Sequence, residues 1–281
     1  MAASSMPDPT PYEVFRALHE TPGCFVMPNP WDGASALILA RAGFPALASS
    51  SLAVAFAMGF PDGAAALGRE ESIANAALIA RLTRLPVNGD LEDGFGRRAE
   101  DCVATVEAAI AAGLAGLGIE DTTADPASPI HDFDAAVARI RAAATAAKGR
   151  IVLTARADNF LCGRPDLDDT IRRLVAFAEA GADVLYAPGL PDMDAISDVV
   201  RAVAPKPVNV VVGPRSGPVP VSVLAAAGVK RISLGGMLYR HAMGALSVAA
   251  DHLKAGDIPA LTGALPSAEI TAMIKAARAA G

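Results

Sequence analysis

The sequence predicts an α/β fold of the (β/α)8 TIM-barrel type, built as a single domain over residues 1–281. Two observations favour this fold class. Short apolar runs that end in polar residues or glycine alternate, about every 30 residues, with longer Ala- and Leu-rich segments of helical pattern. The phrase Ala-Gly followed by an apolar residue recurs in 41–44, 111–114, 179–182 and 226–229. Apolar strands that alternate with helices are typical of a parallel sheet covered on both faces.

Eight strands are expected in order along the chain, at 24–27, 46–49, 86–90, 116–120, 151–156, 184–187, 208–212 and 231–234. Helices are expected between them at 34–42, 101–112, 168–180 and 221–227, each followed by a glycine that can take the positive φ of a helix C-terminus. Two more helices follow the last strand, at 239–256 and 267–280. Eight units fit a closed barrel better than an open doubly wound sheet. No GxGxxG motif follows the first strand, which disfavours a dinucleotide-binding fold.

Composition excludes several function classes. The chain carries 24 Lys and Arg against 30 Asp and Glu, a net charge of −6, and has no basic run. Nucleic acid and anionic membranes are therefore not expected as partners. Three scattered cysteines suggest neither a zinc site nor a redox pair. With no signal-like N-terminus and no apolar run of about 18 residues, we expect a cytoplasmic protein.

Acidic residues are expected to gather at the carboxyl end of the barrel, where barrel enzymes place their active sites. They are Asp62, Asp90, Glu92, Glu120 and Asp121. Carboxylates in one small site repel each other unless a cation relieves them, and Mg²⁺ or Mn²⁺ prefers such oxygen ligands. We therefore predict a metal site at Asp90, Glu92 and Glu120. The alternative is that these acids cap helices, which we expect of Asp93 and Asp121.

Other residues at strand ends are candidates for binding. Arg156 follows the fifth strand and is expected either to hold a substrate carboxylate or to pair with one of the acids. The serines at 49–51 lack the context of a nucleophile but could bind an oxyanion. His131 could reach the mouth from its loop, although an exposed loop histidine is the more common outcome. Cys162 has no nearby base that would activate it.

Several of these segments resemble the isocitrate lyase/phosphoenolpyruvate mutase superfamily. The likeness runs over about residues 12–255 and rests on 29–36, 48–51, 59–63, 90–96, 118–121, 154–158 and 232–236. It implies a (β/α)8 barrel whose C-terminal helix, within the tail at about 257–281, is swapped onto a neighbouring subunit to give homodimers or homotetramers. It also implies a Mg²⁺ or Mn²⁺ cofactor and chemistry at a C–C or P–C bond next to an α-oxo acid, through an enolate.

The resemblance also implies roles for individual residues. Asp90 would ligate the metal, with its partner acids binding directly or through water, and the turn after the second strand would bind the substrate carboxylate. We predict catalytic roles for Arg156, Glu120 and Asp62, substrate-binding roles for Ser50, Ser51, Leu52, Trp31 and Asn209, and metal binding by Asp90, Glu92 and Glu120.

Two departures from the superfamily pattern affect the expected reaction. The lyase branch carries a Lys-Lys/Arg-Cys-Gly-His loop after the fourth strand, whereas 122–131 here contains neither cysteine nor lysine. The asparagine of the mutase branch is absent there too, and Pro188 stands where those branches carry Glu or His. Decarboxylation suits what remains, while retro-aldol cleavage needs a base, for which His131 is the remote candidate.

Three functions follow as hypotheses. The first is a Mg²⁺-dependent lyase that splits a C–C bond, by retro-aldol cleavage or decarboxylation, in a small α-oxo or 2-hydroxy di- or tricarboxylic acid. The second is P–C chemistry on phosphonopyruvate. The third is a carboxylate- or phosphate-binding barrel with little turnover. The glycine-rich segments 213–217 and 235–236, which follow the last two strands, favour the second or third if a phosphorylated ligand binds.

Overall fold

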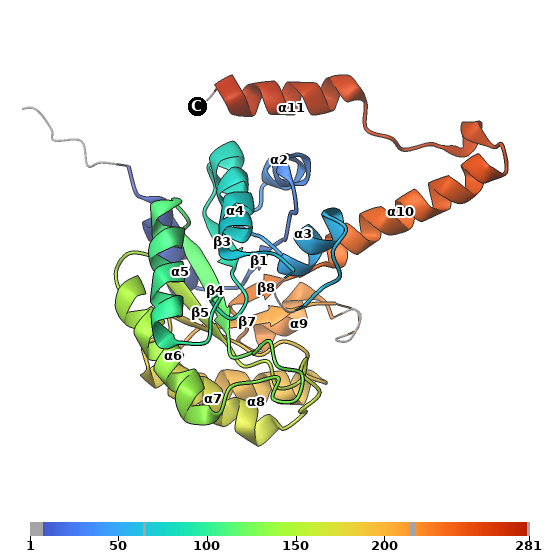
Figure 1. Ribbon diagram of the computed structural model, residues 1–281. Coiled ribbons are helices and arrows are strands. Elements are labelled where there is room, and N and C mark those ends of the chain that lie inside the picture. The colour runs from blue at the N-terminus through green and yellow to red at the C-terminus, as the bar shows by residue number, and fades with distance from the viewer. Residues whose placement is uncertain (1–7, 64–65, 214–216, 218, 280–281) are drawn as a thin grey trace, which may run out of the picture.

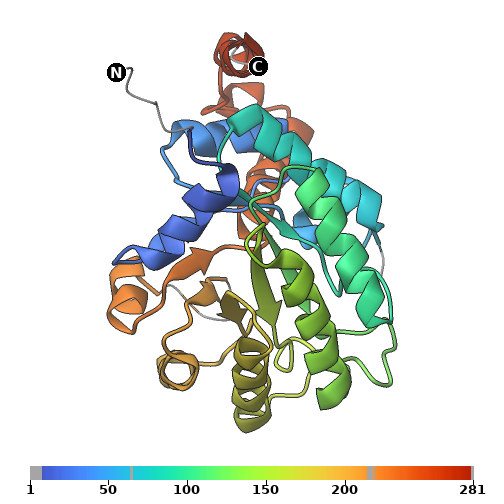
Figure 2. The ribbon, with the colours of Figure 1, turned by 90° about the vertical axis from the view of Figure 1, so that its left-hand side faces the viewer.

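The computed structural model describes residues 8–63, 66–213, 217 and 219–279. Eight parallel strands form a nearly closed barrel, with helices packed around its outside (Figures 1 and 2), and the predicted (β/α)8 fold is confirmed. The strands are β1 (Phe25–Met27), β2 (Leu47–Ala48), β3 (Val87–Asp90), β4 (Gly116–Glu120), β5 (Val152–Arg156), β6 (Val184–Tyr186), β7 (Val208–Val211) and β8 (Arg231–Ser233). Each predicted strand is present, and the sheet runs in the order β1-β8-β7-β6-β5-β4-β3-β2.

The barrel closes between β1 and β2 through a few hydrogen bonds rather than a regular ladder. The amide of Ala48 donates to the carbonyl of Pro28 at 3.1 Å. Asn29, which is buried, donates from Nδ2 to the carbonyl of Ser49 at 2.9 Å. Its Oδ1 accepts from the amides of Leu234 and Gly235 at 2.9 and 3.0 Å. One side chain therefore joins the loops after β1, β2 and β8 at the carboxyl end of the barrel.

Helices alternate with the strands as the sequence predicts. They are α1 (Pro11–Glu20), α2 (Gly33–Arg41), α3 (Ser51–Ala57), α4 (Arg69–Thr83), α5 (Ala99–Ala111), α6 (Phe133–Ala147), α7 (Leu167–Glu179), α8 (Met193–Val203), α9 (Val221–Ala226), α10 (Met237–Lys254) and α11 (Ser267–Ala279), with a 3-10 turn at Ile258–Ala260. Asp32, Asp132, Asp166 and Asp192 cap α2, α6, α7 and α8, and each accepts a hydrogen bond from the amide three residues on. These caps fix where each helix leaves its strand-end loop.

The opposite, amino end of the barrel is filled by side chains. Phe15 of α1 is fully buried there and packs with Met27 and Val152. Arg231 at the start of β8 is also buried, and its guanidinium donates to Asn209 Oδ1 at 2.8 Å and to Thr154 Oγ1 at 2.9 Å. This end of the barrel is therefore a packed core, and the open end is the one that carries the acidic residues.

The C-terminal segment leaves the barrel. The helix α10 extends outward and α11 turns back over α2 and α4 (Figure 1), where Glu269 pairs with Arg41 at 2.5 Å. Among the described residues, neither helix has a buried side chain, and Leu246 and Val248 are 60% and 58% exposed. Within the described part of the chain, no helix combines the length and apolar character that crossing a membrane requires.

Candidate active site

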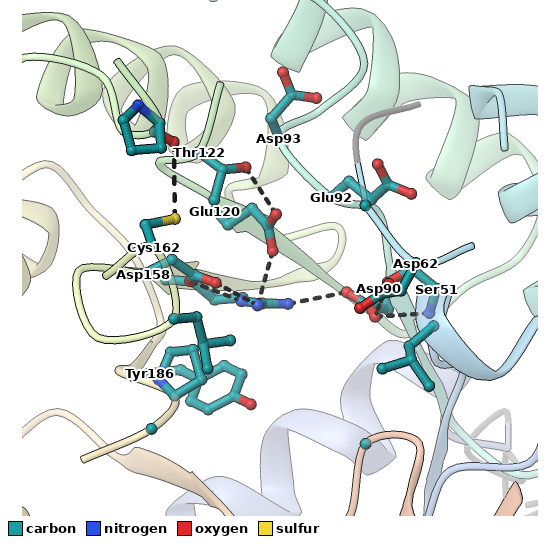
Figure 3. Close-up of a pocket in the computed structure, with 18 of the residues that line it drawn as sticks. Ser51, Asp62, Asp90, Glu92, Asp93, Glu120, Thr122, Asp158, Cys162 and Tyr186 are labelled. Carbon is teal, nitrogen blue, oxygen red and sulfur yellow. Dashed lines mark hydrogen bonds and ion pairs between the residues drawn. The ribbon is translucent and has the colours of Figure 1, made fainter. Parts of the chain in front are cut away.

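The carboxyl ends of the strands open into a cavity of about 1190 Å³. One wall comes from the segments after β2 to β5 and is acidic, whereas the wall from β6 to β8 is mostly apolar. The acidic wall holds a group of four carboxylates around one arginine, which we call the acidic cluster (Figure 3). It consists of Asp62, Asp90, Glu120, Asp158 and Arg156.

Asp90, the last residue of β3, links two neighbouring strand ends. Its Oδ2 accepts from both the amide and the hydroxyl of Ser51, each at 2.8 Å. Its Oδ1 accepts from Nη1 of Arg156 at 3.1 Å. The amide of Asp90 in turn donates to Ser49 Oγ at 2.9 Å. The carboxylate is therefore fixed at the point where α3 begins.

Arg156 lies at the centre of the cluster and is largely buried. Besides Asp90, it pairs through Nη2 with Glu120 at 2.8 Å and with Asp158 at 2.7 Å. Its side chain is 14% exposed, and its guanidinium lies 5.1 Å from the centre of the Tyr186 ring. Of the two roles expected for Arg156, the structure shows the pairing with acids. A substrate carboxylate would have to share this guanidinium with three protein carboxylates.

A second ionic layer supports the first from behind. Asp121 Oδ1 accepts from the amide of Asp158 at 2.9 Å, and its Oδ2 accepts from Arg173 at 3.0 Å. Asp93 accepts from the amide of Phe95 at 2.8 Å within a turn. The expectation that Asp93 and Asp121 cap helices is therefore wrong. The buried Asp121 instead accepts hydrogen bonds from the amide and guanidinium donors behind the site.

Two carboxyl groups of the cluster, those of Glu120 and Asp62, have raised pKa values. Burial, together with the charges of Asp158 and Asp90, outweighs the effect of Arg156 and raises the pKa of Glu120 to about 8. Burial and the charge of Asp90 likewise raise the pKa of Asp62. Glu120 and Arg156 lie at ion-pair distance, 2.8 Å, but one guanidinium cannot neutralise the four carboxylates of the cluster. Without a further cation, we therefore expect Glu120 to be the cluster member that takes up a proton near neutral pH.

This protonation predicts a pH dependence of stability that depends on Glu120. A folded-state pKa above the usual value means that Glu120 opposes folding increasingly as pH rises from about 4.5 to about 8. The glutamine of Glu120→Gln cannot ionise. The thermal midpoint of this variant, measured relative to that of the wild type, should therefore rise between about pH 5 and pH 8.5. Melting curves recorded with a metal chelator would measure this.

Glu107 provides the control for that experiment. Its carboxyl is exposed and pairs with Arg150, which lowers its pKa. Glu107→Gln should therefore differ from the wild type by a constant amount over the same pH range. If the difference for Glu120→Gln were equally constant, Glu120 would be ionised throughout and the charge argument would be wrong.

The predicted metal ligands lie at one cavity but do not form a ready three-ligand centre. Asp90, Glu92 and Glu120 all line the cavity. Within the ranges that the structure describes, no three acidic, histidine or cysteine side chains converge closely enough to hold a metal between them. Mg²⁺ commonly binds through one or two carboxylates and keeps several waters. The neighbouring Asp62 and Asp90 fit such a site, because burial and the charge of Asp90 both raise the pKa of Asp62 and a cation would offset both effects.

Glu92 is held in an unusual backbone conformation beside these residues. Its φ is +46°, in the left-handed region that side chains other than glycine rarely adopt. Its carbonyl accepts from the amide of Glu120 at 2.9 Å, which ties the ends of β3 and β4 together. Figure 3 shows its side chain on the same side of the cavity as Asp62 and Asp90. Such strain is often retained at functional sites.

Three of the five predicted substrate-binding residues reach the cavity. Ser50, Ser51 and Leu52 line it at the start of α3, where Ser50 is the N-cap. The amide of Ser51 already donates to Asp90 and that of Ala53 to Ser50 Oγ, which leaves the first-turn amide of Leu52 to donate to an anion.

The structure places the other two predicted substrate-binding residues, Trp31 and Asn209, away from the cavity, because neither is among the described residues that line it. The Trp31 ring packs edge-on against Tyr239 of α10, with 5.3 Å between ring centres. Asn209 is 2% exposed, and its amide group is used by Arg231 and by Ser233, to which it donates at 3.0 Å. Its side chain points into the barrel, because strand residues alternate between the two faces of the sheet. Asn209 lies too deep along its strand to reach the mouth.

Further residues at the cavity were given no role in the sequence prediction. Thr122 donates to Glu120 Oε1 at 2.8 Å and orients that carboxylate. Asp158 completes the acidic cluster. Arg240, on the first turn of α10, lines the cavity and has no ion pair to a residue that the structure describes. Position after a strand could have indicated Asp158, which stands two residues beyond Arg156, but nothing local in the sequence signals Arg240.

The loop after β4 carries His131, the remote candidate for a base. This histidine lines the cavity, and its Nε2 is buried without a hydrogen-bond partner among the described residues. Burial lowers the pKa of its imidazole, which favours the neutral form. Cys162 also lines the cavity, and burial raises the pKa of its thiol to about 11, so it is not an activated nucleophile.

Comparison with known proteins identifies the family. The phosphoenolpyruvate phosphomutase family model matches residues 15–254. The chain belongs to this family. A structure from Burkholderia cenocepacia J2315, described as a candidate lyase/mutase, is 46% identical to this phosphomutase-family chain. The match has a TM-score of 0.89 and covers 92% of this chain and 94% of the other. The likeness to the isocitrate lyase/phosphoenolpyruvate mutase superfamily is thereby confirmed.

Two other relatives carry names that describe reactions. The oxaloacetate decarboxylase of Pseudomonas aeruginosa is 32% identical over 186 residues, which cover 64% of this chain and 63% of that protein. The structure of 2,3-dimethylmalate lyase, a PEP mutase/isocitrate lyase superfamily member, is 26% identical with a TM-score of 0.86, and the match covers 97% of this chain and all of that one. This phosphomutase-family chain is accordingly an enzyme of a superfamily of lyases and mutases.

Proposed function

We propose that the protein is a Mg²⁺- or Mn²⁺-dependent carbon–carbon lyase that acts on a small 2-oxo or 2-hydroxy di- or tricarboxylic acid through an enolate. The observation that carries the proposal is the position of Asp90, which joins the first turn of α3 to Arg156 at the mouth of the barrel. The names of the oxaloacetate decarboxylase and dimethylmalate lyase relatives support the substrate class.

Residues of the cavity could stabilise the negative charge of the enolate. A divalent cation bound beside Asp62 and Asp90 would lower the cost of enolate charge. The first-turn amide of Leu52 and the guanidinium of Arg156 are oriented before the substrate arrives, and fixed donors stabilise developing charge best. Arg240 is available for a second carboxylate of the substrate at the cavity rim.

Decarboxylation is the form of the reaction that these residues support best. The bond between C3 of a 2-oxo dicarboxylate and its leaving carboxylate breaks, CO₂ departs, and the electron pair forms the enolate. A proton then adds to C3. Water at the open mouth of the cavity can supply this proton. Retro-aldol cleavage of a 2-hydroxy acid instead needs a base, for which the neutral His131 is the candidate.

A ligand-binding experiment tests the proposed site. Oxalate resembles the enolate of pyruvate, and a ligand that binds only the folded state raises the thermal midpoint. We expect oxalate and Mg²⁺ together to raise the midpoint more than either alone, and oxaloacetate to yield pyruvate. No shift with either component or both, and no pyruvate, would contradict the proposal. The binding-barrel hypothesis would then stand in its place if another carboxylate shifted the midpoint without turnover.

Phosphorus–carbon chemistry on phosphonopyruvate is the second candidate. Gly213, Gly235 and Gly236 line the same cavity, as expected for a phosphate-binding segment after β7 and β8. Residues 214–216 of the predicted segment lie outside the described residues. Stabilisation by inorganic phosphate, in competition with oxalate, would favour this reading.

We also infer that the protein is a homodimer or homotetramer. The exposed apolar side chains of α10 and α11 support this inference, because large apolar patches on a surface are typical of interfaces. A C-terminal helix exchanged between subunits, as the superfamily resemblance implies, would cover them.

A further inference from the structure

Tyr186, the last residue of β6, carries a hydroxyl group at the cavity. Between 186 and 236, it has the one polar side chain among the described residues that line the cavity. Its ring centre lies 5.1 Å from the guanidinium of Arg156. Figure 3 shows the hydroxyl turned toward the side of the cavity on which Asp90 and Ser51 lie. The phenol therefore faces the place where the enolate is proposed to form.

A series of hydrogen bonds, which we call the relay, leads to this hydroxyl from the barrel core. Nε of Arg231 donates to Oδ1 of Asn209 at 2.8 Å, and Nδ2 of Asn209 donates to Oγ of Ser233 at 3.0 Å. The hydrogen bond of Ser233 to Tyr186 acts to lower the pKa of the phenol, as a donor to the phenolate oxygen does. Each donor in the relay thus points toward the Tyr186 oxygen. Among the described residues the phenol donates to no acceptor, so its proton is available to a ligand.

The relay starts at a cation without an acidic partner. Arg231 is 2% exposed and forms no ion pair with a residue that the structure describes. It donates instead to Thr154 at 2.9 Å and to His19, whose imidazole burial keeps neutral by lowering its pKa to about 3. An ionised Tyr186 would raise the pKa of Arg231, so the two groups are close enough for their charges to interact. The guanidinium would therefore stabilise negative charge that arises on the Tyr186 oxygen.

Two other hydroxyls beside the acidic cluster are already in use. Ser51 donates to Asp90, and Thr122 donates to Glu120. Burial raises the pKa of the Tyr186 phenol, so its proton is present throughout the neutral pH range. A neutral phenol can protonate a carbanion, because the carbanion is a far stronger base than a phenolate.

We propose that Tyr186, rather than a water molecule, is the proton donor that converts the enolate into the 2-oxo acid product. The phenolic O–H bond breaks, and its proton forms a C–H bond at C3 with the electron pair that the departing CO₂ left. The O–H electron pair stays on the phenolate oxygen, to which Ser233 donates, and Arg156 and Arg231 offset its charge. Water then returns a proton to the phenolate and leaves as hydroxide. This inference rests on the proposed lyase function and assigns its proton donor.

The position that solvent deuterium takes in the product tests the inference. The substrate would be 3-methyloxaloacetate, because deuterium that adds to C3 of its enolate in D₂O creates a stereocentre in the 2-oxobutyrate product. Reduction by a stereospecific lactate dehydrogenase converts the two possible configurations into diastereomers that proton NMR distinguishes. With Mg²⁺, the wild-type protein should deliver deuterium to one face and yield predominantly one diastereomer.

Two variants test the phenol and the relay. Tyr186→Phe keeps the ring beside Arg156 and removes only the hydroxyl. We expect kcat for pyruvate formation from oxaloacetate to fall by about 10²-fold, and the 3-methyl substrate to give a nearly equal mixture of diastereomers, because water then adds the proton. The rise in thermal midpoint with oxalate and Mg²⁺ should persist. Ser233→Ala, which removes the last donor of the relay, should lower kcat by about 10-fold and keep the stereochemical preference.

Tyr239→Phe is the matched control, because it makes the same change at a tyrosine outside the cavity, where the ring packs against Trp31. It should match the wild type in rate and stereochemistry. A Tyr186→Phe variant with the wild-type rate would overturn the inference, and so would a slower one that keeps the stereochemical preference. In both cases the lyase function would stand. No turnover of either substrate by the wild type, together with no stabilisation by oxalate and Mg²⁺, would overturn both.

Discussion

Replacing Asp90 with alanine is expected to lower kcat/KM for the lyase reaction by at least about 10³-fold while the chain still folds. The variant removes the carboxylate closest to the proposed cation and leaves the amide of Ser51 without its acceptor. Arg156 keeps its pairs with Glu120 and Asp158, so the barrel mouth is not left with an unpaired cation. Pyruvate release from oxaloacetate in the presence of Mg²⁺ would measure the loss.

Binding and control variants make this expectation specific. The rise in thermal midpoint produced by oxalate with Mg²⁺ should vanish in Asp90→Ala. In Asp90→Asn, which can still accept from Ser51 but lacks the charge, it should be strongly reduced. Asp194→Ala, at an exposed position on α8 outside the cavity, should behave as the wild type. If Asp90→Ala kept the combined effect of oxalate and Mg²⁺, the proposed metal site would be wrong.

Replacing Arg156 with methionine is expected to have the largest effect on stability. The change leaves the carboxylates of Asp90, Glu120 and Asp158 facing each other without their shared cation. Removing one partner of a buried ion pair typically costs about 3–5 kcal/mol. Urea unfolding with a chelator present should show a loss of about this size at pH 8. The loss should be smaller at about pH 5.5, where the carboxyls can take up protons.

A surface arginine provides the matched comparison for Arg156. Arg150 forms a bidentate pair with Glu107, but both side chains are about half exposed. Solvent screens such a pair, so Arg150→Met should change the free energy of unfolding far less than Arg156→Met does. Equal effects of the two substitutions would show that the acidic cluster is not effectively buried. Partial recovery by Mg²⁺ in Arg156→Met would support a cation site among the same carboxylates.

Local sequence patterns were sufficient to predict the strands. Each expected strand lies at the predicted place to within one or two residues, from β1 at Phe25–Met27 to β8 at Arg231–Ser233. The reason is that a buried parallel strand needs a short apolar run, and the following helix ends at a glycine with positive φ, as Gly113 and Gly228 do. Both signals are confined to a few neighbouring residues and can be read without knowledge of the fold.

Which side chains meet at the cavity was predicted only in part. Barrel topology correctly gathers Asp62, Asp90, Glu120 and Arg156 at one end, because parallel strands align their carboxyl ends. The same rule misplaced Asn209, since its position one residue into β7 puts it at the depth of the buried Arg231. Trp31 was misplaced because its loop turns the ring toward α10.

The sequence by itself determined the class of fold, the family, and the concentration of acid at the ends of β3 and β4. Only the tertiary structure decided that Arg156 is shared by three carboxylates, that Thr122 orients Glu120, and that the Tyr186 ring lies against Arg156. Strand patterns arise from interactions between residues close in the chain. Ion pairs such as that between Asp90 and Arg156, 66 residues apart, depend on strand depth, rotamer and loop path, which no local pattern encodes.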